Sequence, residues 1–321
     1  MSDDELHPGL EGIAVAETRL SRIDGHTGEL VIGGYPIDDL AGNATYEESV
    51  FLLFEDRLPD ADELANFRAD LADRRAIGEE VHAVLERAAR EDKDAMDALR
   101  MGAAAANLGH EDGDSEIDAK RVIAAFPTIV AAYWRYREGE EPLEPRDDLR
   151  HAANYLYLLT GEEPTEAEVR GVETYLNTVI DHGLNASTFT ARVVVSTESD
   201  VVSAATAAVG TLKGPLHGGA PGPVLDMLKE IHEEGDPEGW VEEALDSGDR
   251  LMGFGHRVYR VRDPRAAVLQ TAAEEFYADG NEFFQTVQDF ESVAVDALAK
   301  EHPNRTLQTN VEFYTAALLN G

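Results

Sequence analysis

The residues best suited to chemistry are gathered in one short segment, residues 253–265. There His256 follows a Gly-x-Gly turn, and four arginines come directly after it: Arg257, Arg260, Arg262 and Arg265. The whole chain has a formal net charge of -37, so a local cluster of cations is unexpected. Guanidinium groups beside an imidazole can bind an anion and transfer a proton on it. The segment therefore predicts a pocket for a small anionic substrate.

Two further histidines, His182 and His217, also lie at breaks between predicted helices, each with a glycine next to it. Glycine lets the backbone approach a ligand closely, and a helix N-terminus presents free N–H groups to anions. One histidine at a helix end is more often a cap or a buried core residue. Three histidines in glycine-rich breaks, one of them leading into an arginine cluster, favour a shared site.

Other chemistries fit less well. No cysteine is present and no two histidines have the four-residue spacing of a zinc motif, so we expect no metal site. The stretch 210–214 lacks the ending of a phosphate-binding loop, and no Gly-x-Ser-x-Gly elbow marks a serine nucleophile. Acid/base catalysis by histidine and carboxylate on an anion remains, with arginines holding the substrate.

Composition restricts the class of protein and its surroundings. The 321 residues include 64 Asp and Glu but only 27 Lys and Arg, while hydrophobic residues make up 43%. Such an acidic yet globular chain is typical of a salt-rich cytoplasm, where screening weakens repulsion between carboxylates, so we expect a halophile. Nucleic acid and anionic membranes are unfavourable partners. The start lacks signal-peptide features and no apolar run spans a bilayer, which favours a cytoplasmic location.

The expected elements are almost all helical. A small hairpin is predicted at 20–34, with its turn at 24–28 and His26 as a polar turn residue. Capping boxes at Thr45 and Thr165 start two helices, and Asp263 precedes a proline at the start of another. Further helices are expected over the ranges 120–136, 186–197, 201–212, from about 223, 281–300 and 306–319. No strand–helix alternation occurs, so the fold class is all-α with one hairpin.

Four segments resemble signature segments of citrate synthases, in the same order and at similar spacing. They are 181–189 (DHGLNASTF), 214–220 (GPLHGGA), 253–259 (GFGHRVY) and 310–314 (NVEFY). The N-terminal stretches 9–13 (GLEGI) and 34–37 (GYPI) are similar to the shorter bacterial and archaeal branch of the family. The resemblance covers nearly the whole chain.

This resemblance implies a helical homodimer whose two domains close on oxaloacetate and so create the acetyl-CoA site. We expect a large domain at 1–218 and a small domain at 219–321, separated near the Gly- and Pro-rich stretch 214–222. The implied activity is an acyltransferase of the tricarboxylic acid cycle, which condenses acetyl-CoA with oxaloacetate. Acetyl-CoA is then a co-substrate, and no tightly bound cofactor is expected.

The resemblance also implies roles for individual residues. As catalytic residues, His217 hydrogen-bonds the thioester oxygen, Glu312 abstracts the methyl proton and His256 polarises the ketone. His182 and Arg265 bind oxaloacetate carboxylates. The CoA-binding positions are Arg260, near the phosphates, and the backbone of Leu251, Gly253 and Gly255, near the adenine.

Two departures from the family pattern are visible. Glu312 stands where the family has aspartate, and one extra methylene moves the carboxylate by roughly 1–1.5 Å unless the backbone compensates. A displacement of about 1 Å can cost ~100-fold in rate. The chain ends at Gly321, where family members usually continue with two substrate-binding arginines; Arg257 and Arg262 are candidate substitutes. Two alternatives stay open: a 2-methylcitrate synthase acting on propionyl-CoA, and an impaired paralogue that binds ligands or regulates a partner.

Overall fold

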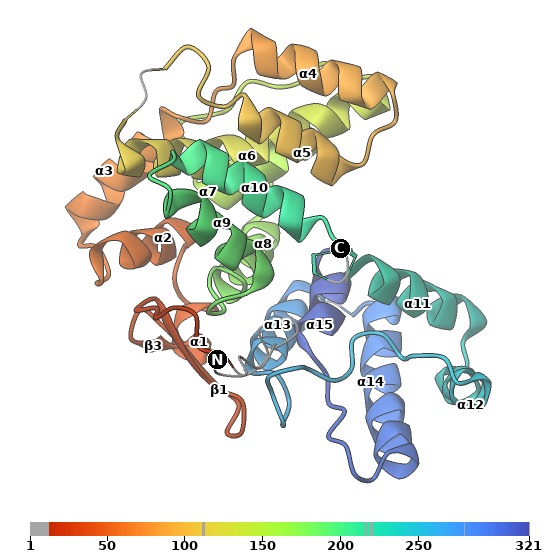
Figure 1. Cartoon of the computed structure of the whole chain (residues 1–321). Coiled ribbons are helices and arrows are strands. Elements are labelled where there is room, and N and C mark those ends of the chain that lie inside the picture. The colour runs from red at the N-terminus through yellow and green to blue at the C-terminus, as the bar shows by residue number, and fades with distance from the viewer. Residues whose placement is uncertain (1–12, 111–112, 216, 219–220, 279, 321) are drawn as a thin grey trace, which may run out of the picture.

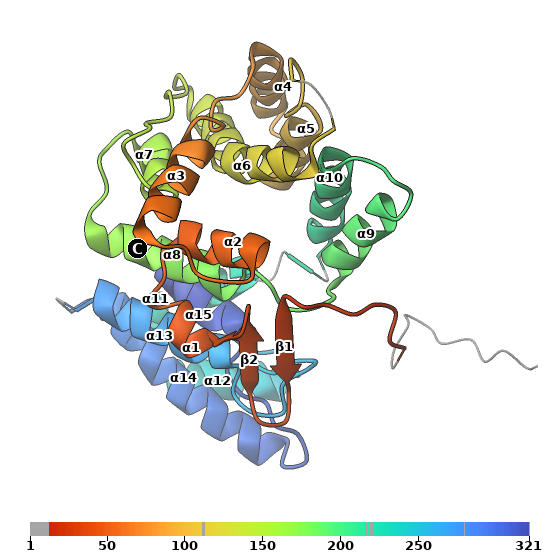
Figure 2. The same ribbon diagram turned by 90° about the vertical axis from the view of Figure 1, so that its left-hand side faces the viewer.

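The computed structural model of the chain describes residues 13–320 except 111–112, 216, 219–220 and 279. In these residues it has fifteen helices and one small sheet (Figure 1 and Figure 2). The helices are α1 (Ile37–Leu40), α2 (Tyr46–Glu55), α3 (Ala61–Ala72), α4 (Glu79–Arg90), α5 (Ala95–Ala104), α6 (Ser115–Glu138), α7 (His151–Thr160), α8 (Glu166–Thr178), α9 (Ala186–Val195), α10 (Val201–Leu212), α11 (Pro221–Glu234), α12 (Pro237–Ser247), α13 (Pro264–Phe276), α14 (Glu282–Glu301) and α15 (Val311–Leu318). The predicted fold class, all-α with an N-terminal hairpin, is confirmed.

The hairpin consists of β1 (Ser21–Asp24) and β2 (Glu29–Ile32), antiparallel and paired from Ser21 with Ile32 to Asp24 with Glu29. The Asp24 carboxylate accepts the N–H groups of His26 and Thr27, which is how an aspartate closes a turn. The sequence did not predict β3 (Tyr35–Pro36), which pairs with β2 on its other side. This two-residue strand is too short to leave a periodic signal.

Local signals set the starts of several helices. The hydroxyl of Thr45 accepts the Glu48 N–H while the Glu48 carboxylate accepts the Thr45 N–H, and Thr165 with Glu168 repeats this arrangement. Both predicted capping boxes are therefore confirmed. Asp263 caps α13 as expected. The predicted segment 120–136 belongs to the 24-residue helix α6, with Pro127 inside it.

Helices α9 and α10 lie side by side, and the Thr211 hydroxyl donates to the Thr190 hydroxyl over 3.0 Å. Helices α11–α15 lie together in the lower right of Figure 1, away from α3–α6. The division into domains 1–218 and 219–321 stays a prediction. Residues 9–12 of the N-terminal stretch 9–13 and residues 216, 219 and 220 of the 214–220 segment lie outside the described residues.

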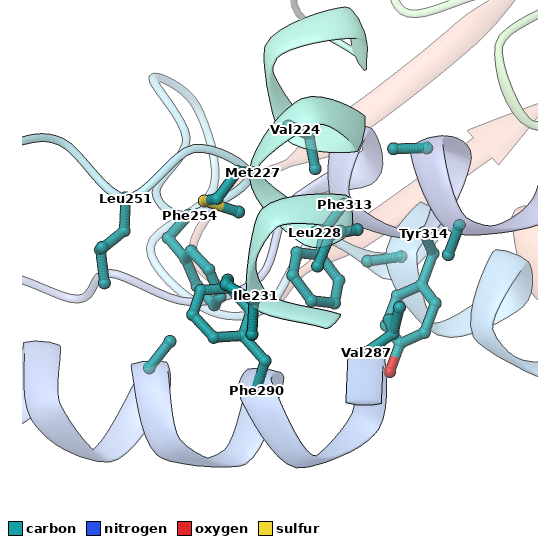
Figure 3. Close-up of a cluster of buried hydrophobic side chains, with 14 of the residues drawn as sticks. Val224, Met227, Leu228, Ile231, Leu251, Phe254, Val287, Phe290, Phe313 and Tyr314 are labelled. Atoms are coloured by element: carbon teal, nitrogen blue, oxygen red, sulfur yellow. The ribbon is translucent and has the colours of Figure 1, made fainter. Parts of the chain in front are cut away.

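One large buried cluster ties the site-bearing segments together. Its buried members come only from residues 224–318, with α11 and α14 providing much of the apolar surface. Leu251 and Phe254 enter it from the loop before His256, and Phe313 and Tyr314 enter it from α15 (Figure 3). The Phe254 and Phe313 ring centroids are 5.3 Å apart. Packing of these rings therefore fixes the loop that carries His256 against the helix that carries Glu312.

Among the described residues, no helix combines the length and apolar character needed to cross a membrane.

Candidate active site

A short backbone pairing brings two distant segments together. The Gly255 N–H donates to the Gln308 carbonyl over 2.7 Å, and the Asn310 N–H donates to the Gly253 carbonyl over 2.9 Å. The Asn310 side chain adds a bond from Nδ2 to the Gly255 carbonyl, while its Oδ1 accepts the Glu312 N–H at the start of α15. His256 and Glu312 are therefore held at neighbouring ends of one small pairing.

His256 has a defined orientation. Its Nδ1 accepts the N–H groups of Val258 and Tyr259, at 3.0 and 3.1 Å. In the neutral ring the proton must then be on Nε2, which lies 3.4 Å from Nη2 of Arg265. Burial lowers the pKa of His256, which keeps the ring neutral near pH 7. Two donors, Nε2–H and a guanidinium N–H, therefore face one space, which suits an anionic oxygen acceptor.

Arg265 is held by a buried carboxylate. Asp263 is 1% exposed and Arg265 7%, and the guanidinium donates from Nε and Nη2 to both Asp263 oxygens, at 3.0 and 2.8 Å. Asp263 Oδ2 also accepts the Val311 N–H over 3.3 Å, which links this pair to the start of α15. A bidentate pair fixes the guanidinium plane as well as its charge. Asp263 was predicted only as a helix cap, so its second function was missed.

His182 joins the same group from the loop between α8 and α9. Its ring centroid is 5.7 Å from that of His256, and its Nε2 is 3.0 Å from the Tyr259 hydroxyl. Burial, with a smaller contribution from the Arg265 charge, lowers the pKa of His182 to about 4. The ring is therefore neutral at pH 7 and can take part in hydrogen bonds without adding positive charge.

Glu312 is the second residue of α15 and is half-buried. Burial raises the pKa of its carboxyl above the ordinary value; Arg265 opposes the shift and Asp263 adds to it. A carboxylate with a raised pKa is a stronger base than an exposed one and is still ionised at neutral pH when the shift is modest. Glu312 therefore has the surroundings of a general base.

His217 lies on a different segment, after α10. Its Nε2 is 2.9 Å from the Ser187 hydroxyl, at the start of α9, and that hydroxyl also lies 2.8 Å from Asn185 Oδ1. Among the described residues, His217 makes no hydrogen bond or ring contact with His182 or His256. The structure therefore gathers His182, His256, Arg265 and Glu312, and places His217 with α9.

A cleft of about 880 Å³ lies beside this group. Leu251, Gly255, His256 and Arg260 are among the residues that line it. Gly253 is instead buried with φ +85°, and a Cβ there would come within 2.9 Å of the Phe313 ring. Gly253 thus allows the close approach of loop and helix.

The cleft also contains cations that the sequence did not single out. Arg250 and Arg305 line it, together with His302, Asn304 and Arg257. Arg305 lies between α14 and α15, far along the chain from the arginine cluster, so no local spacing points to it. Arg262, a candidate substrate ligand, instead donates to Glu291 and Gln270. Within the described residues no group of three metal-ligating side chains occurs.

The fold and the site define a class: a helical protein that combines two neutral histidines, a buried arginine and a carboxylate of raised pKa beside a cation-lined cleft. The profile of the family described as "Citrate synthase, C-terminal domain" matches residues 9–321. The citrate synthase of Haloferax volcanii is 44% identical over 98% of this chain and 84% of its own length.

Solved structures agree. The citrate synthase of Pyrobaculum aerophilum has a TM-score of 0.86 and 34% identity, covering 98% of this chain and 81% of that one. That of Thermoplasma acidophilum, a ternary complex with carboxymethyl coenzyme A and oxaloacetate, also has a TM-score of 0.86, with 29% identity and coverage of 98% and 84%. A 2-methylcitrate synthase of Mycobacterium tuberculosis is 38% identical over 84% of this chain and 70% of its length. The chain belongs to the citrate synthase family and is an acyltransferase.

Proposed function

We propose that this protein condenses acetyl-CoA with oxaloacetate, giving citrate and CoA, through the residues gathered around His256. The observation that carries the proposal is the convergence of His256 Nε2 and the Arg265 guanidinium on one space, with Glu312 held at the adjoining helix start. A ketone that bears carboxylates needs such a combination of donors, and carbon–carbon bond formation needs a base beside it.

Oxaloacetate binding rests on Arg265, His182 and His256. The Arg265 guanidinium keeps N–H groups beyond those used by Asp263, so it can still bind a substrate carboxylate. His256 donates from Nε2 to the ketone oxygen, and this hydrogen bond strengthens as the oxygen gains negative charge. Because the ring is neutral, the developing alkoxide is stabilised by a hydrogen bond and by the nearby arginine charge.

Glu312 and His217 carry out the enolisation of acetyl-CoA. The Glu312 carboxylate removes a methyl proton, and a His217 N–H stabilises the enol oxygen. The Ser187 hydroxyl donates its one proton to Asn185 Oδ1, so it accepts from Nε2–H of His217 and holds the ring as the Nε2 tautomer. Donation of this N–H to the enol oxygen therefore requires it to leave Ser187 when the substrate binds.

CoA binds in the cleft of about 880 Å³. The cleft is lined by four arginines, Arg250, Arg257, Arg260 and Arg305, which suit the phosphates. Leu251 and Gly255 present backbone and apolar surface for the adenine. In a chain of net charge -37, this cation-rich lining draws an anionic ligand to one place.

We also infer a homodimer in a salt-rich cytoplasm. Helix α9 has no buried residue, and Phe189, Val193 and Val195 on it are 36, 50 and 43% exposed. Apolar side chains exposed along one helix are typical of a surface that a partner covers. The acidic composition and the similarity to the Haloferax volcanii enzyme support the salt-rich setting. Light scattering in molar KCl tests the dimer, and a monomeric mass would contradict it.

The activity test measures free CoA released from acetyl-CoA plus oxaloacetate in molar KCl. The chain contains no cysteine, so a thiol reagent reports CoA alone. Release that requires both substrates is the expected result. No release, with oxaloacetate binding still seen by calorimetry, would instead identify a ligand-binding paralogue.

The similarity to a 2-methylcitrate synthase keeps propionyl-CoA as a second substrate candidate. The two acyl groups differ by one methylene, which is worth about 1–3 kcal/mol in a pocket. Comparison of kcat/KM for the two thioesters decides between them. We expect a preference for acetyl-CoA, and a higher value for propionyl-CoA would assign the chain to the other reaction.

A further inference from the structure

Tyr259 contacts both histidines of the oxaloacetate site without facing the cleft. It is 1% exposed, and its hydroxyl is 3.0 Å from His182 Nε2. Its backbone N–H donates to His256 Nδ1 over 3.1 Å, and its ring centroid is 4.8 Å from that of His256. One buried residue therefore holds two imidazoles from distant parts of the chain, His182 through its hydroxyl and His256 through its backbone N–H.

The N-terminal hairpin holds Tyr259 from the other side. The Arg260 N–H donates to the Gly25 carbonyl over 2.7 Å, at the hairpin turn. A Cβ on Gly25 would lie 2.3 Å from the Val258 carbonyl oxygen, so only glycine permits this approach. The hairpin turn at Gly25 thus fixes the position of residues 258–260 relative to the hairpin.

The same strand also reaches the segment of His182. The Gly183 N–H donates to the Ser21 hydroxyl over 3.1 Å, and it is shared with the Asp181 carboxylate at 3.0 Å. The contacts form a closed ring: β1 and the turn residue Gly25, then Arg260 and Tyr259, then His182 and Gly183, and back to Ser21 in β1. We call this arrangement the contact ring. A closed set of short contacts leaves each member few alternative positions.

We propose that Tyr259 is a positioning residue for oxaloacetate binding, and that the hairpin turn at Gly25 fixes it through the contact ring. The inference rests on the proposed function, because it assigns His182 and His256 to oxaloacetate. Tyr259 does not touch substrate in this arrangement. Its hydroxyl holds the ring of His182, while its backbone amide holds Nδ1 of His256 and so leaves the Nε2 proton directed at the ketone site.

The first test does not depend on activity. Imidazole ¹⁵N resonances are recorded for the parent, Tyr259→Phe and a matched control, Tyr277→Phe, with His182→Gln and His256→Gln used for assignment. Tyr277 also donates its hydroxyl, to the Ala317 carbonyl, but contacts neither histidine. We expect the His182 resonances to shift in Tyr259→Phe only. Unchanged His182 resonances in Tyr259→Phe would overturn the proposal.

The second test separates positioning from simple loss of stability. Tyr259→Phe keeps the ring and the backbone amide, so we expect KM for oxaloacetate to rise ~10-fold, as for one lost hydrogen bond, with kcat changed less than ~3-fold. Tyr277→Phe should leave both constants unchanged. Equal effects of the two variants, or a lower melting temperature with an unchanged KM, would show a merely structural role.

Gly25→Ala tests the hairpin. Its methyl group must displace residues 258–260, so kcat/KM is expected to fall ~10- to 100-fold, because a shift of about 1 Å costs that much. Gly42→Ala is the control, since a Cβ there meets nothing within 4 Å. Equal kcat/KM for the two glycine variants would remove the hairpin from the proposal. An inactive parent would contradict the proposed function, while the resonance experiment would still decide the role of Tyr259.

Discussion

The protonation states of individual residues determine what the site can do. Burial lowers the pKa of both His182 and His256 and raises that of Glu312. The two imidazoles are therefore neutral donors or acceptors at pH 7, and Glu312 is a carboxylate with increased basicity. The positive charge comes from Arg265, which Asp263 orients. These assignments lead to two measurable consequences at the residue scale.

The pH dependence should follow Glu312. It accepts a proton only when ionised, so kcat/KM should rise with pH through one ionisation above the ordinary glutamate value. Glu312→Gln should lower kcat by at least ~100-fold, the usual contribution of a general base. Glu282→Gln, an exposed first-turn position of α14, serves as the control. A Glu312→Gln variant with the parent's kcat and pH profile would exclude Glu312 as the base.

Arg265→Lys should weaken oxaloacetate binding. A lysine keeps the charge but not the planar fork that Asp263 holds from two sides, so we expect KM for oxaloacetate to rise ~10- to 100-fold, or roughly 1.4–2.7 kcal/mol. KM for acetyl-CoA should change much less. Arg262→Lys is the matched control, because Arg262 pairs with Glu291 outside the site. Similar KM values for the two variants would remove Arg265 from the substrate site.

At the scale of elements, the site depends on pairings between segments that carry few catalytic residues themselves. The 253–255 turn pairs with 308–310, and the hairpin turn meets residues 258–260. These pairings therefore decide where the site residues lie.

A buried histidine away from the site makes the stability of the fold depend on pH. At the start of α7, His151 is 4% exposed, and its ring centroid is 4.7 Å from that of Tyr46. Burial, and the nearby Arg75 charge, lower the pKa of His151 to about 3.

His151 should make stability depend on pH. In the unfolded chain it takes up a proton below its ordinary pKa of about 6.5, whereas in the folded chain it stays neutral until about pH 3. Its contribution is thus present above pH 6.5 and is lost as pH falls. Between pH 6 and 4 the unfolding free energy of the parent should fall by up to ~1.4 kcal/mol per pH unit more than that of His151→Phe. Chemical denaturation of both proteins measures this difference, and parallel pH curves would contradict it.

At the scale of the whole molecule, the net charge of -37 determines how stability and ligand binding respond to salt. Many exposed carboxylates repel one another, and salt screens this repulsion over about 10 Å at 0.1 M and about 3 Å at 1 M. The cation-lined cleft is a local exception to that acidic surface. Stability and ligand binding should therefore respond to salt in opposite directions, because screening also weakens attraction between cleft arginines and an anionic ligand.

The unfolding midpoint should rise when KCl is increased from 0.1 to 2 M. A variant with Glu233, Glu234, Glu242 and Glu243 each changed to Gln has a formal charge of -33, that is -37 plus 4, and removes four exposed carboxylates from α11 and α12. Added salt should raise the unfolding midpoint of this variant less than that of the parent. Thermal unfolding at both concentrations measures the effect. Identical salt responses would show that repulsion between these carboxylates does not limit stability.

The sequence by itself determined the helical fold class, the hairpin and the starts of several helices, among them α2, α8 and α13, whereas α15 begins at Val311 and not at the expected residue 306. Those features depend on near neighbours: Thr45 and Glu48 form a capping box because they are three residues apart, and Asp24 closes its own turn. It also provided the candidate residues, through segments that resemble the family. What it could not give is the surroundings of each residue, because burial and partner choice depend on residues far along the chain.

Only the tertiary structure decided which candidates meet and how each is held. Phe254 packs on Phe313, and Tyr259 hydrogen-bonds His182, 77 residues away. The sequence predicted Asp263 as a helix cap, but it did not predict the hydrogen bond that Asp263 Oδ2 accepts from the Val311 N–H at the start of α15. Side-chain packing and long-range hydrogen bonds select one arrangement among many that local propensity allows. The neutral histidines and the basic Glu312 are consequences of that burial, and so belong to the fold rather than to the local sequence.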